Sequence, residues 1–132
     1  LLHCQLVAGD GPHPLHAICV HLGLRESHRR EQLRLLGEVL QETAPRDAPL
    51  IVAGDFNDWR SRGHAIVAGF GLREVFAEAH GRLARTFPVR WPVLPVDRIY
   101  VRNVQVTQPR VLNAKPWTHL SDHAPLVAQV AW

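Results

Sequence analysis

The sequence has 132 residues, enough for one domain with a sizeable core. Hydrophobic residues make up 46% and charged residues 20%, as in ordinary globular proteins, and the absence of any run of roughly eighteen apolar residues excludes a transmembrane segment. The net charge of +3 comes almost wholly from arginine, whose planar fork suits phosphate oxygens, although a solvated basic surface explains the same balance.

The start of the chain does not look like the start of a protein. It contains no methionine and opens directly on an apolar segment. We therefore expect residues 1–132 to form a single, incomplete domain whose N-terminal half is missing. No positively charged and then apolar leader is visible, so we expect a cytoplasmic location.

The first two predicted elements are strands at 2–8 and 15–21, joined by a turn over 9–14 that is rich in Gly, Pro and Asp. A symmetric register places Cys4 opposite Cys19, close enough for a disulfide. Because nothing marks the chain as exported, we favour two reduced cysteines in the core.

The next segment, 26–43, has the pattern of an amphipathic helix that ends before Pro45. Its apolar residues recur at helical spacing, and its charged residues take other faces: Leu33, Leu36, Val39 and Leu40 on one side, and Arg29, Arg30, Arg34, Glu38 and Glu42 on the others.

The rest of the chain alternates between strands and short helices. Residues 50–53 form a continuous apolar run, typical of a strand buried on both faces. Two short segments and a loop rich in Gly, Arg, Pro and Trp precede three further strands, so the predicted elements are 61–69, 72–79, 97–102, 104–111 and 124–131. This order predicts an α/β (α+β) fold with a mixed sheet.

The sharpest local motif follows the buried strand, where Asp55 and Asn57 flank Phe56. In extended backbone the two polar side chains point the same way and Phe56 points into the core. A carboxylate beside an amide suits a water and a phosphoryl oxygen, and ligands bind beyond the carboxyl ends of strands in open α/β sheets. A polar turn that ends a strand fits these residues equally well.

Three other strand ends carry polar residues: His21 closes a strand, Asp97 opens one, and Asp122 with His123 precedes another. Each is compatible with an ordinary structural role. Adjacent Asp and His residues are not a serine-hydrolase triad, because neighbours cannot adopt relay geometry. Taken together, four strand ends that carry Asp, Asn or His favour one common site.

These motifs resemble the second half of the endonuclease/exonuclease/phosphatase superfamily, which has the pancreatic-deoxyribonuclease-like fold. The resemblance covers the whole chain in order and approximate spacing, and it rests on Val20-His21-Leu22 with Arg30 and Gln32, Gly54-Asp55-Phe56-Asn57, Asp97-Arg98-Ile99, and Ser121-Asp122-His123 followed by Pro125-Leu126. It implies the second half of a four-layer α/β sandwich with mixed, mostly antiparallel sheets.

The resemblance also implies hydrolysis of a phosphodiester by in-line attack of an activated water. By motif position, Asp55 would activate or align that water and Asn57 would help to hold it or the phosphate. His123 would contact the scissile phosphate, Asp97 would fix the tautomer of His123, and His21 would be a second imidazole that faces the phosphate.

The implied cofactor is Mg²⁺, with Mn²⁺ as an alternative, and its ligands in this chain would be Asp122 and Asp55. Mg²⁺ needs only one or two carboxylates in addition to waters and phosphate oxygens. In the family, however, the main metal-binding Glu comes from the first half. We therefore expect this chain alone to bind Mg²⁺ poorly and to hydrolyse nothing efficiently.

Two other functions stay open, a non-catalytic scaffold that keeps the fold and a metal-binding protein that uses the nine histidines. The second is disfavoured because no two histidines have a clean metal spacing with cysteine or pair at i, i+4 on a helix. The substrate partner also stays open between a nucleic acid, a phospholipid headgroup and another organic phosphate. The loop with Arg82, Arg85, Arg90 and Trp91 could contact a phosphate, stack on a base, or pack as plain surface.

Overall fold

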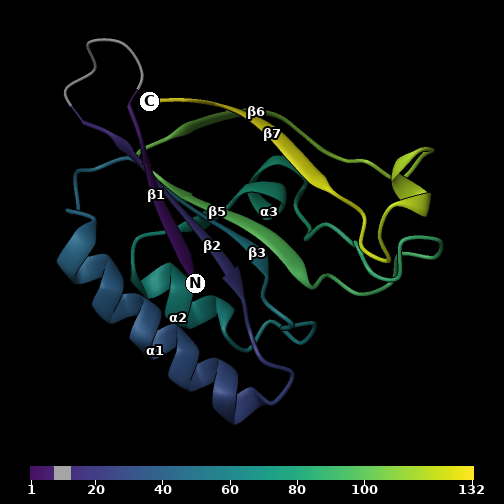
Figure 1. Cartoon of the computed structure of the whole chain (residues 1–132), viewed down its shortest axis with the longest axis horizontal. Helices are drawn as coiled ribbons and strands as arrows, with labels where there is room; N and C mark the ends of the chain where they lie inside the picture. The colour runs from purple at the N-terminus through teal and green to yellow at the C-terminus, as the bar shows by residue number, and fades with distance from the viewer. Residues whose placement is uncertain (8–12) are drawn as a thin grey trace.

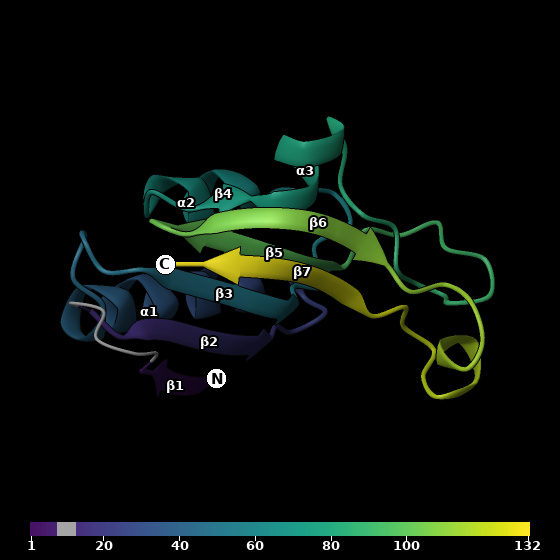
Figure 2. The same ribbon diagram turned by 90° about the horizontal axis from the view of Figure 1, so that it is seen from above.

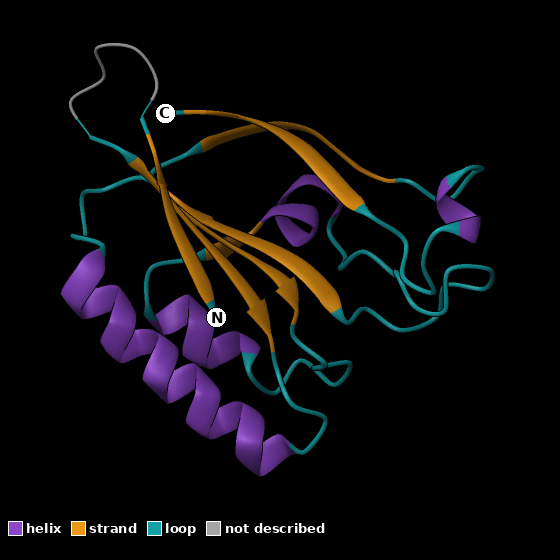
Figure 3. Cartoon of the chain, in the orientation of Figure 1, coloured by secondary structure: helices purple, strands orange, loops and turns teal. Residues whose placement is uncertain are grey.

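The computed structural model describes residues 1–7 and 13–132 and contains two sheets, with two of the helices against one face of the larger sheet and a third, short helix beside the second sheet (Figures 1 and 3). A five-stranded sheet has the order β1-β2-β3-β5-β4, and β6 pairs with β7 in a second sheet. The elements are β1 (Leu2–Leu6), β2 (Leu15–His21), α1 (Glu26–Thr43), β3 (Leu50–Asp55), α2 (His64–Gly69), β4 (Arg73–Glu74), α3 (Val75–His80), β5 (Asp97–Arg102), β6 (Gln105–Val111), the 3-10 helix η1 (Trp117–His119) and β7 (Leu126–Ala131).

The elements follow the predictions closely, and the helix over 26–43 and the strands near 97–102 and 104–111 are confirmed. The predicted segment 72–79 divides into β4 and α3. Only β2 and β3 pair in parallel, and the other strand pairs are antiparallel, so the prediction of a mixed, mostly antiparallel arrangement is confirmed. Most of the predicted turn over 9–14 lies outside the described residues.

The layers follow from the alternation of side chains along β3. Leu50 and Val52 are fully buried in a core shared with α1 and α2, whereas Ile51 packs toward the sheet of β6 and β7. Figure 2 shows β6 and β7 lying over β3 and β5. Side chains at even positions of β3 therefore face the helices, and those at odd positions face the second sheet.

The cysteine prediction is wrong in two respects. The last pair between β1 and β2 is Leu6 with Leu15, which places Cys4 opposite Ala17 and Cys19 opposite Leu2. The strand ends two residues earlier than a symmetric turn requires, so the two thiols are not in register. Both cysteines are exposed rather than in the core, and both are free, as favoured from the sequence.

The expected polar position of Arg29 on the helix is also wrong, because this side chain is buried. Its guanidinium donates hydrogen bonds to the carbonyls of Gly23 and Leu24 and lies 5.5 Å from the ring centroid of Trp59. The start of α1 is thus fastened to the turn that follows β2. None of the described helices is long and apolar enough to cross a bilayer.

Gly54 allows β2 and β3 to approach closely just before Asp55. Its φ is +139°, and a Cβ built at this position would lie 2.0 Å from the carbonyl oxygen of Val20. A side chain here would face both backbone strain and a clash with main-chain atoms that cannot rotate away. The position immediately before Asp55 therefore requires glycine.

We expect Gly54→Ala to lower the free energy of unfolding by roughly 3 kcal/mol or more, because strain and overpacking combine. The measurement is the midpoint of urea unfolding followed by circular dichroism. Gly69→Ala is the matched control, since no heavy atom lies within 4 Å of its Cβ position. Equal stability of the two variants would contradict the assigned role of Gly54.

Candidate active site

Three of the predicted site residues lie in one row across the large sheet. The parallel register of β2 and β3 pairs His21 with Asp55, and the antiparallel register of β3 and β5 pairs Asp55 with Asp97. Directly paired residues project from the same face, here the face toward the second sheet. The Nε2 of His21 lies 3.7 Å from Oδ2 of Asp55, although the His21 side chain is largely exposed.

His123 joins this row from the segment that precedes β7. Its Nδ1 lies 2.8 Å from Oδ2 of Asp97, and its ring packs 4.9 Å from that of Phe87, centroid to centroid. One ligand atom each from Asp55, Asp97 and His123 falls within 4.8 Å of the others. Residues from positions 21 to 123 therefore converge on one place at the end of the sheet.

The charges of this cluster shift two of its pKa values. Burial raises the pKa of the Asp55 carboxyl, the backbone N–H of Asn57 opposes that rise, and the carboxylate of Asp97 adds to it. Burial alone would lower the pKa of His123, but the hydrogen bond and charge of Asp97, with the charges of Asp55 and Asp122, raise it overall. The Asp55 carboxylate is thus a better proton acceptor than a carboxylate in water. His123 stays protonated to a higher pH than an imidazole in water, and in that cationic form it can donate a hydrogen bond.

Asn57 lies near the row but not in the predicted conformation. The strand ends at Asp55, and Asn57 has a φ of 48°, so the expectation that both side chains project from extended backbone is wrong. Its Nδ2 donates to the carbonyl of Leu22 at 2.7 Å, and its backbone N–H donates to Asp55 Oδ1 at 2.8 Å. Phe56 is buried between them as predicted, 5.1 Å from the ring of Tyr100.

Asp122 lies at the edge of the cluster. Its side chain is exposed, and the group formed by Asp55, Asp97 and His123 does not include it. Its backbone carbonyl accepts a hydrogen bond of 2.7 Å from Val89, which fixes the turn that presents His123. The metal-binding role of Asp122 stays a prediction.

The same residues match a known protein family. The model of the endonuclease/exonuclease/phosphatase family matches residues 3–123, which include the whole row and His123. The chain belongs to this family. The expectation drawn from its motifs is confirmed, and members of the family are generally hydrolytic enzymes that depend on a metal.

Relatives give the scale of the match. The chain is 50% identical over 131 residues to the uncharacterized protein YbhP of Escherichia coli (strain K12). The aligned region covers 98% of this chain but only 51% of YbhP. In structure it is similar to D. rerio TDP2 complexed with single-strand DNA product, with a TM-score of 0.71, 22% identity, and coverage of 98% of this chain and 60% of TDP2.

It is also similar to a mannosyl-6-phosphatase of Bacteroides thetaiotaomicron, with a TM-score of 0.73, 20% identity, and coverage of 93% of this chain and 53% of the phosphatase. At these identities the two likenesses show the shared fold. The chain thus spans about half the length of the proteins it matches.

The group formed by Asp55, Asp97 and His123 supplies only some of the oxygen ligands that a hard cation prefers. Mg²⁺ prefers oxygen ligands, and Asp97 is committed to His123 by a hydrogen bond of 2.8 Å. Asp55 is therefore the carboxylate of the group better suited to hold a metal. Each of the six glutamates lies on α1, on α3 or at the start of α3, away from the row. Among the described residues, no glutamate joins Asp55, Asp97 and His123 in the cluster.

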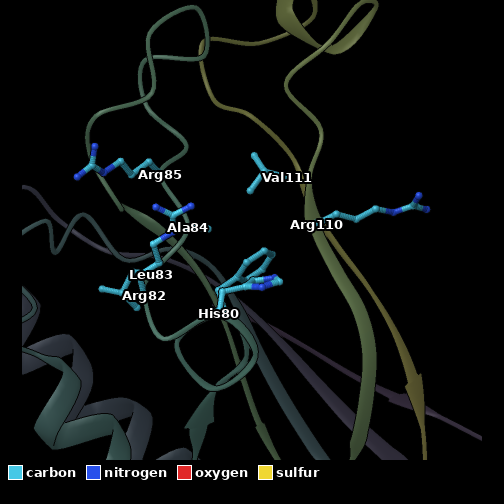
Figure 4. Close-up of a pocket in the computed structure, with 8 residues that line it drawn as sticks. His80, Arg82, Leu83, Ala84, Arg85, Arg110 and Val111 are labelled. Carbon is cyan, nitrogen blue, oxygen red and sulfur yellow. The ribbon is translucent and has the colours of Figure 1, made fainter.

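Two cavities differ in whether residues of the candidate site line them. One of about 310 Å³ lies between the two sheets and is lined by Asp97, Ser121 and His123, with Asp55 outside its lining. Another of about 370 Å³ lies beyond the loop that follows α3, beside His80 and Arg110 (Figure 4). Arg85 and Arg110 point away from each other in this second cavity, so we assign the chemistry to the first.

Sequence reasoning missed two buried side chains that form hydrogen bonds next to the row of His21, Asp55 and Asp97. Arg98 is 1% exposed and donates to the carbonyl of Asp58 at 2.7 Å, and Thr86 is fully buried with its Oγ1 3.4 Å from the backbone N of Asp97. The alternation along β5 carried a usable signal, since an arginine next to Asp97 must point to the helix side. For Thr86 the sequence offered none.

We expect Asp97→Asn to lower the pKa of His123, because the substitution removes the carboxylate that favours the imidazolium form. The measurement is a titration of the imidazole followed by NMR in buffer free of divalent metal. Asp122→Asn is the matched control and should lower that pKa less, since it removes only a nearby charge. Equal shifts in the two variants would contradict the pairing of His123 with Asp97.

Proposed function

We propose that the chain is the C-terminal half of a metal-dependent phosphoesterase that hydrolyses a phosphodiester. The observation that carries this proposal is the convergence of Asp55, Asp97 and His123, with His21 beside them, at one end of the sheet. The reaction class is in-line attack of a water on phosphorus. A P–O bond to water forms, the ester P–O bond breaks, and a phosphomonoester and an alcohol result.

Asp55 is the residue we assign to the attacking water. The N–H of Asn57 holds Oδ1 of its carboxylate in a fixed direction, which suits a group that orients a water and accepts its proton. A proton released as the water attacks would pass to Asp55. In this assignment the backbone of Asn57 orients the base, and its side chain, bonded to Leu22, holds the neighbouring loop in place.

His123 is the residue we assign to the phosphoryl oxygens. Negative charge on these oxygens must be stabilised as the ester bond breaks, so catalysis rests on positioning and electrostatics. Because Asp97 binds Nδ1, the other ring nitrogen is available to face the substrate, and the raised pKa favours the protonated donor. His21 would be a second imidazole on the same side.

Mg²⁺, or Mn²⁺ in its place, is the metal we propose, with Asp55 and Asp122 as its ligands from this chain. Such an ion supplies Lewis-acid stabilisation of the phosphoryl oxygens. Asp122 is exposed and lies outside the group formed by Asp55, Asp97 and His123, so this chain supplies an incomplete set. The remaining ligands are expected from the part of the domain that precedes it.

The structural neighbours support a phosphate ester as the substrate without selecting one. One of them was solved with a single-strand DNA product and another is named as a sugar phosphatase. We propose a phosphodiester of a nucleic acid or of a phospholipid headgroup.

In the longer protein that contains the chain, we expect Asp55→Asn to reduce turnover by about 10²–10⁴-fold, because the base is lost. Hydrolysis of bis(p-nitrophenyl) phosphate with Mg²⁺ measures it, and chelator should abolish wild-type turnover until Mg²⁺ is restored. Asp47→Asn, which changes an exposed carboxylate on a surface turn, is the matched control. Wild-type turnover by Asp55→Asn would refute the role given to Asp55.

We expect the isolated 132-residue chain to show little or no turnover in the same assay and weak Mg²⁺ binding by calorimetry. The reason is that its glutamates lie on α1 and around α3, so the oxygen ligands near Asp55 are too few. Robust chelator-sensitive hydrolysis by the isolated chain would show that it is complete. Inactivity of the longer protein would favour the scaffold hypothesis instead.

A further inference from the structure

Two loops lead directly into the residues of the His123–Asp97 pair. Residues 87–96, the Trp91 loop, end immediately before Asp97, and residues 112–121, the Trp117 loop, end immediately before Asp122 and His123. Both loops project from the same end of the molecule, at the right of Figures 1 and 2. Whatever the loops touch is therefore presented to the candidate site.

The base of the Trp91 loop is fixed to the segment that carries His123. The backbone N–H of Val89 donates to the carbonyl of Asp122 at 2.7 Å, and that of Ala124 donates to Thr86 at 2.9 Å. At the base of the Trp91 loop, Phe87 forms an isolated bridge with Leu94 and packs against the ring of His123. The base of the Trp91 loop thus has a set position relative to the catalytic pair.

The tips expose large apolar side chains. Trp91 is 77% exposed, Leu120 70%, Val93 46% and Trp117 40%. Removal of such side chains from water is favourable, so the exposure of four of them on two loops that lead into one site favours an apolar partner there.

The charge of the two loops has one sign. Neither loop contains an Asp or Glu, and both carry an exposed cation, Arg90 in one and Lys115, the single lysine of the chain, in the other. This distribution is complementary to an anionic surface. The surface of the two loops combines exposed aliphatic and indole groups with cations. It therefore matches a partner that carries negative charges at its surface and has an apolar layer just beneath them.

Two anionic partners meet part of this description. Single-stranded nucleic acid would stack on Trp91 and pair its phosphates with Arg90, but it offers nothing apolar to Val93 and Leu120. An anionic bilayer accepts all of these groups, because indole rings favour the membrane interface, aliphatic side chains enter the acyl boundary, and cations meet the headgroups.

We propose that the Trp91 and Trp117 loops bind the surface of an anionic phospholipid bilayer and present lipid phosphoester headgroups to Asp55 and His123. The choice of a lipid phosphoester as substrate rests on the function proposed above. The membrane contact itself needs no turnover. A peripheral contact of this kind requires only that the loop tips enter the interface.

The test is co-sedimentation of the longer protein with vesicles of phosphatidylglycerol and phosphatidylcholine, compared with vesicles of phosphatidylcholine alone. We expect binding to the anionic vesicles, and a drop of about tenfold or more in affinity for Trp91→Ser combined with Leu120→Ser. Trp132→Ser is the matched control and should bind as wild type, because that tryptophan is 44% exposed but lies at the C-terminus, away from the loops (Figure 1). Arg90→Glu should weaken binding to anionic vesicles selectively.

The outcomes separate this inference from the proposed function. His123→Asn should lose turnover and keep vesicle binding, since the contact does not involve the imidazole. Wild-type protein that hydrolyses a soluble phosphodiester but ignores anionic vesicles would overturn the membrane contact and leave the phosphoesterase standing. Vesicle binding unchanged by the paired loop substitutions would also overturn it. The membrane contact would be overturned as well if the protein bound a single-stranded oligonucleotide but no vesicles, and if these substitutions abolished the binding of the oligonucleotide.

Discussion

The site depends on the register of three strands. His21, Asp55 and Asp97 lie side by side only because β2 pairs with β3 in parallel and β3 with β5 in antiparallel, with Asp55 common to both pairs. A shift of one residue in either pairing would turn a side chain to the helix face of the sheet. On the other face of the sheet, the buried Leu50 and Val52 pack against α1 and stabilise the same register. The hydrophobic core therefore determines the positions of the carboxylates.

The close approach at Gly54 extends this constraint to the backbone. The strand pair narrows at this residue, and Phe56, two residues later, enters the core. Between these two anchors Asp55 has little freedom, and the N–H of Asn57 directs one of its oxygens. A carboxylate held in this way is preorganised, so it needs little rearrangement to meet a polar or charged ligand.

Much of this arrangement was predictable from the sequence and part of it was not. Periodicity identified α1, β3 and β5, and the motifs around Asp55 and His123 identified the family, because both signals are local. The register of Cys4 against Ala17 depends on the length of β1, and the conformation of Asn57 depends on its bond to the distant carbonyl of Leu22. Such features are set by tertiary contacts, as is the burial of Arg98.

The division between sheet and loops has a consequence for how such proteins diversify. The residues of the candidate site stand at the sheet end or immediately after a loop, and Trp91 and Trp117 at the loop tips are not among them. Changes in length or composition at those tips therefore leave the residues of the candidate site in place. The same fold occurs in a protein solved with a single-strand DNA product and in one named as a mannosyl-6-phosphatase, so a shared core fold does not by itself fix the target.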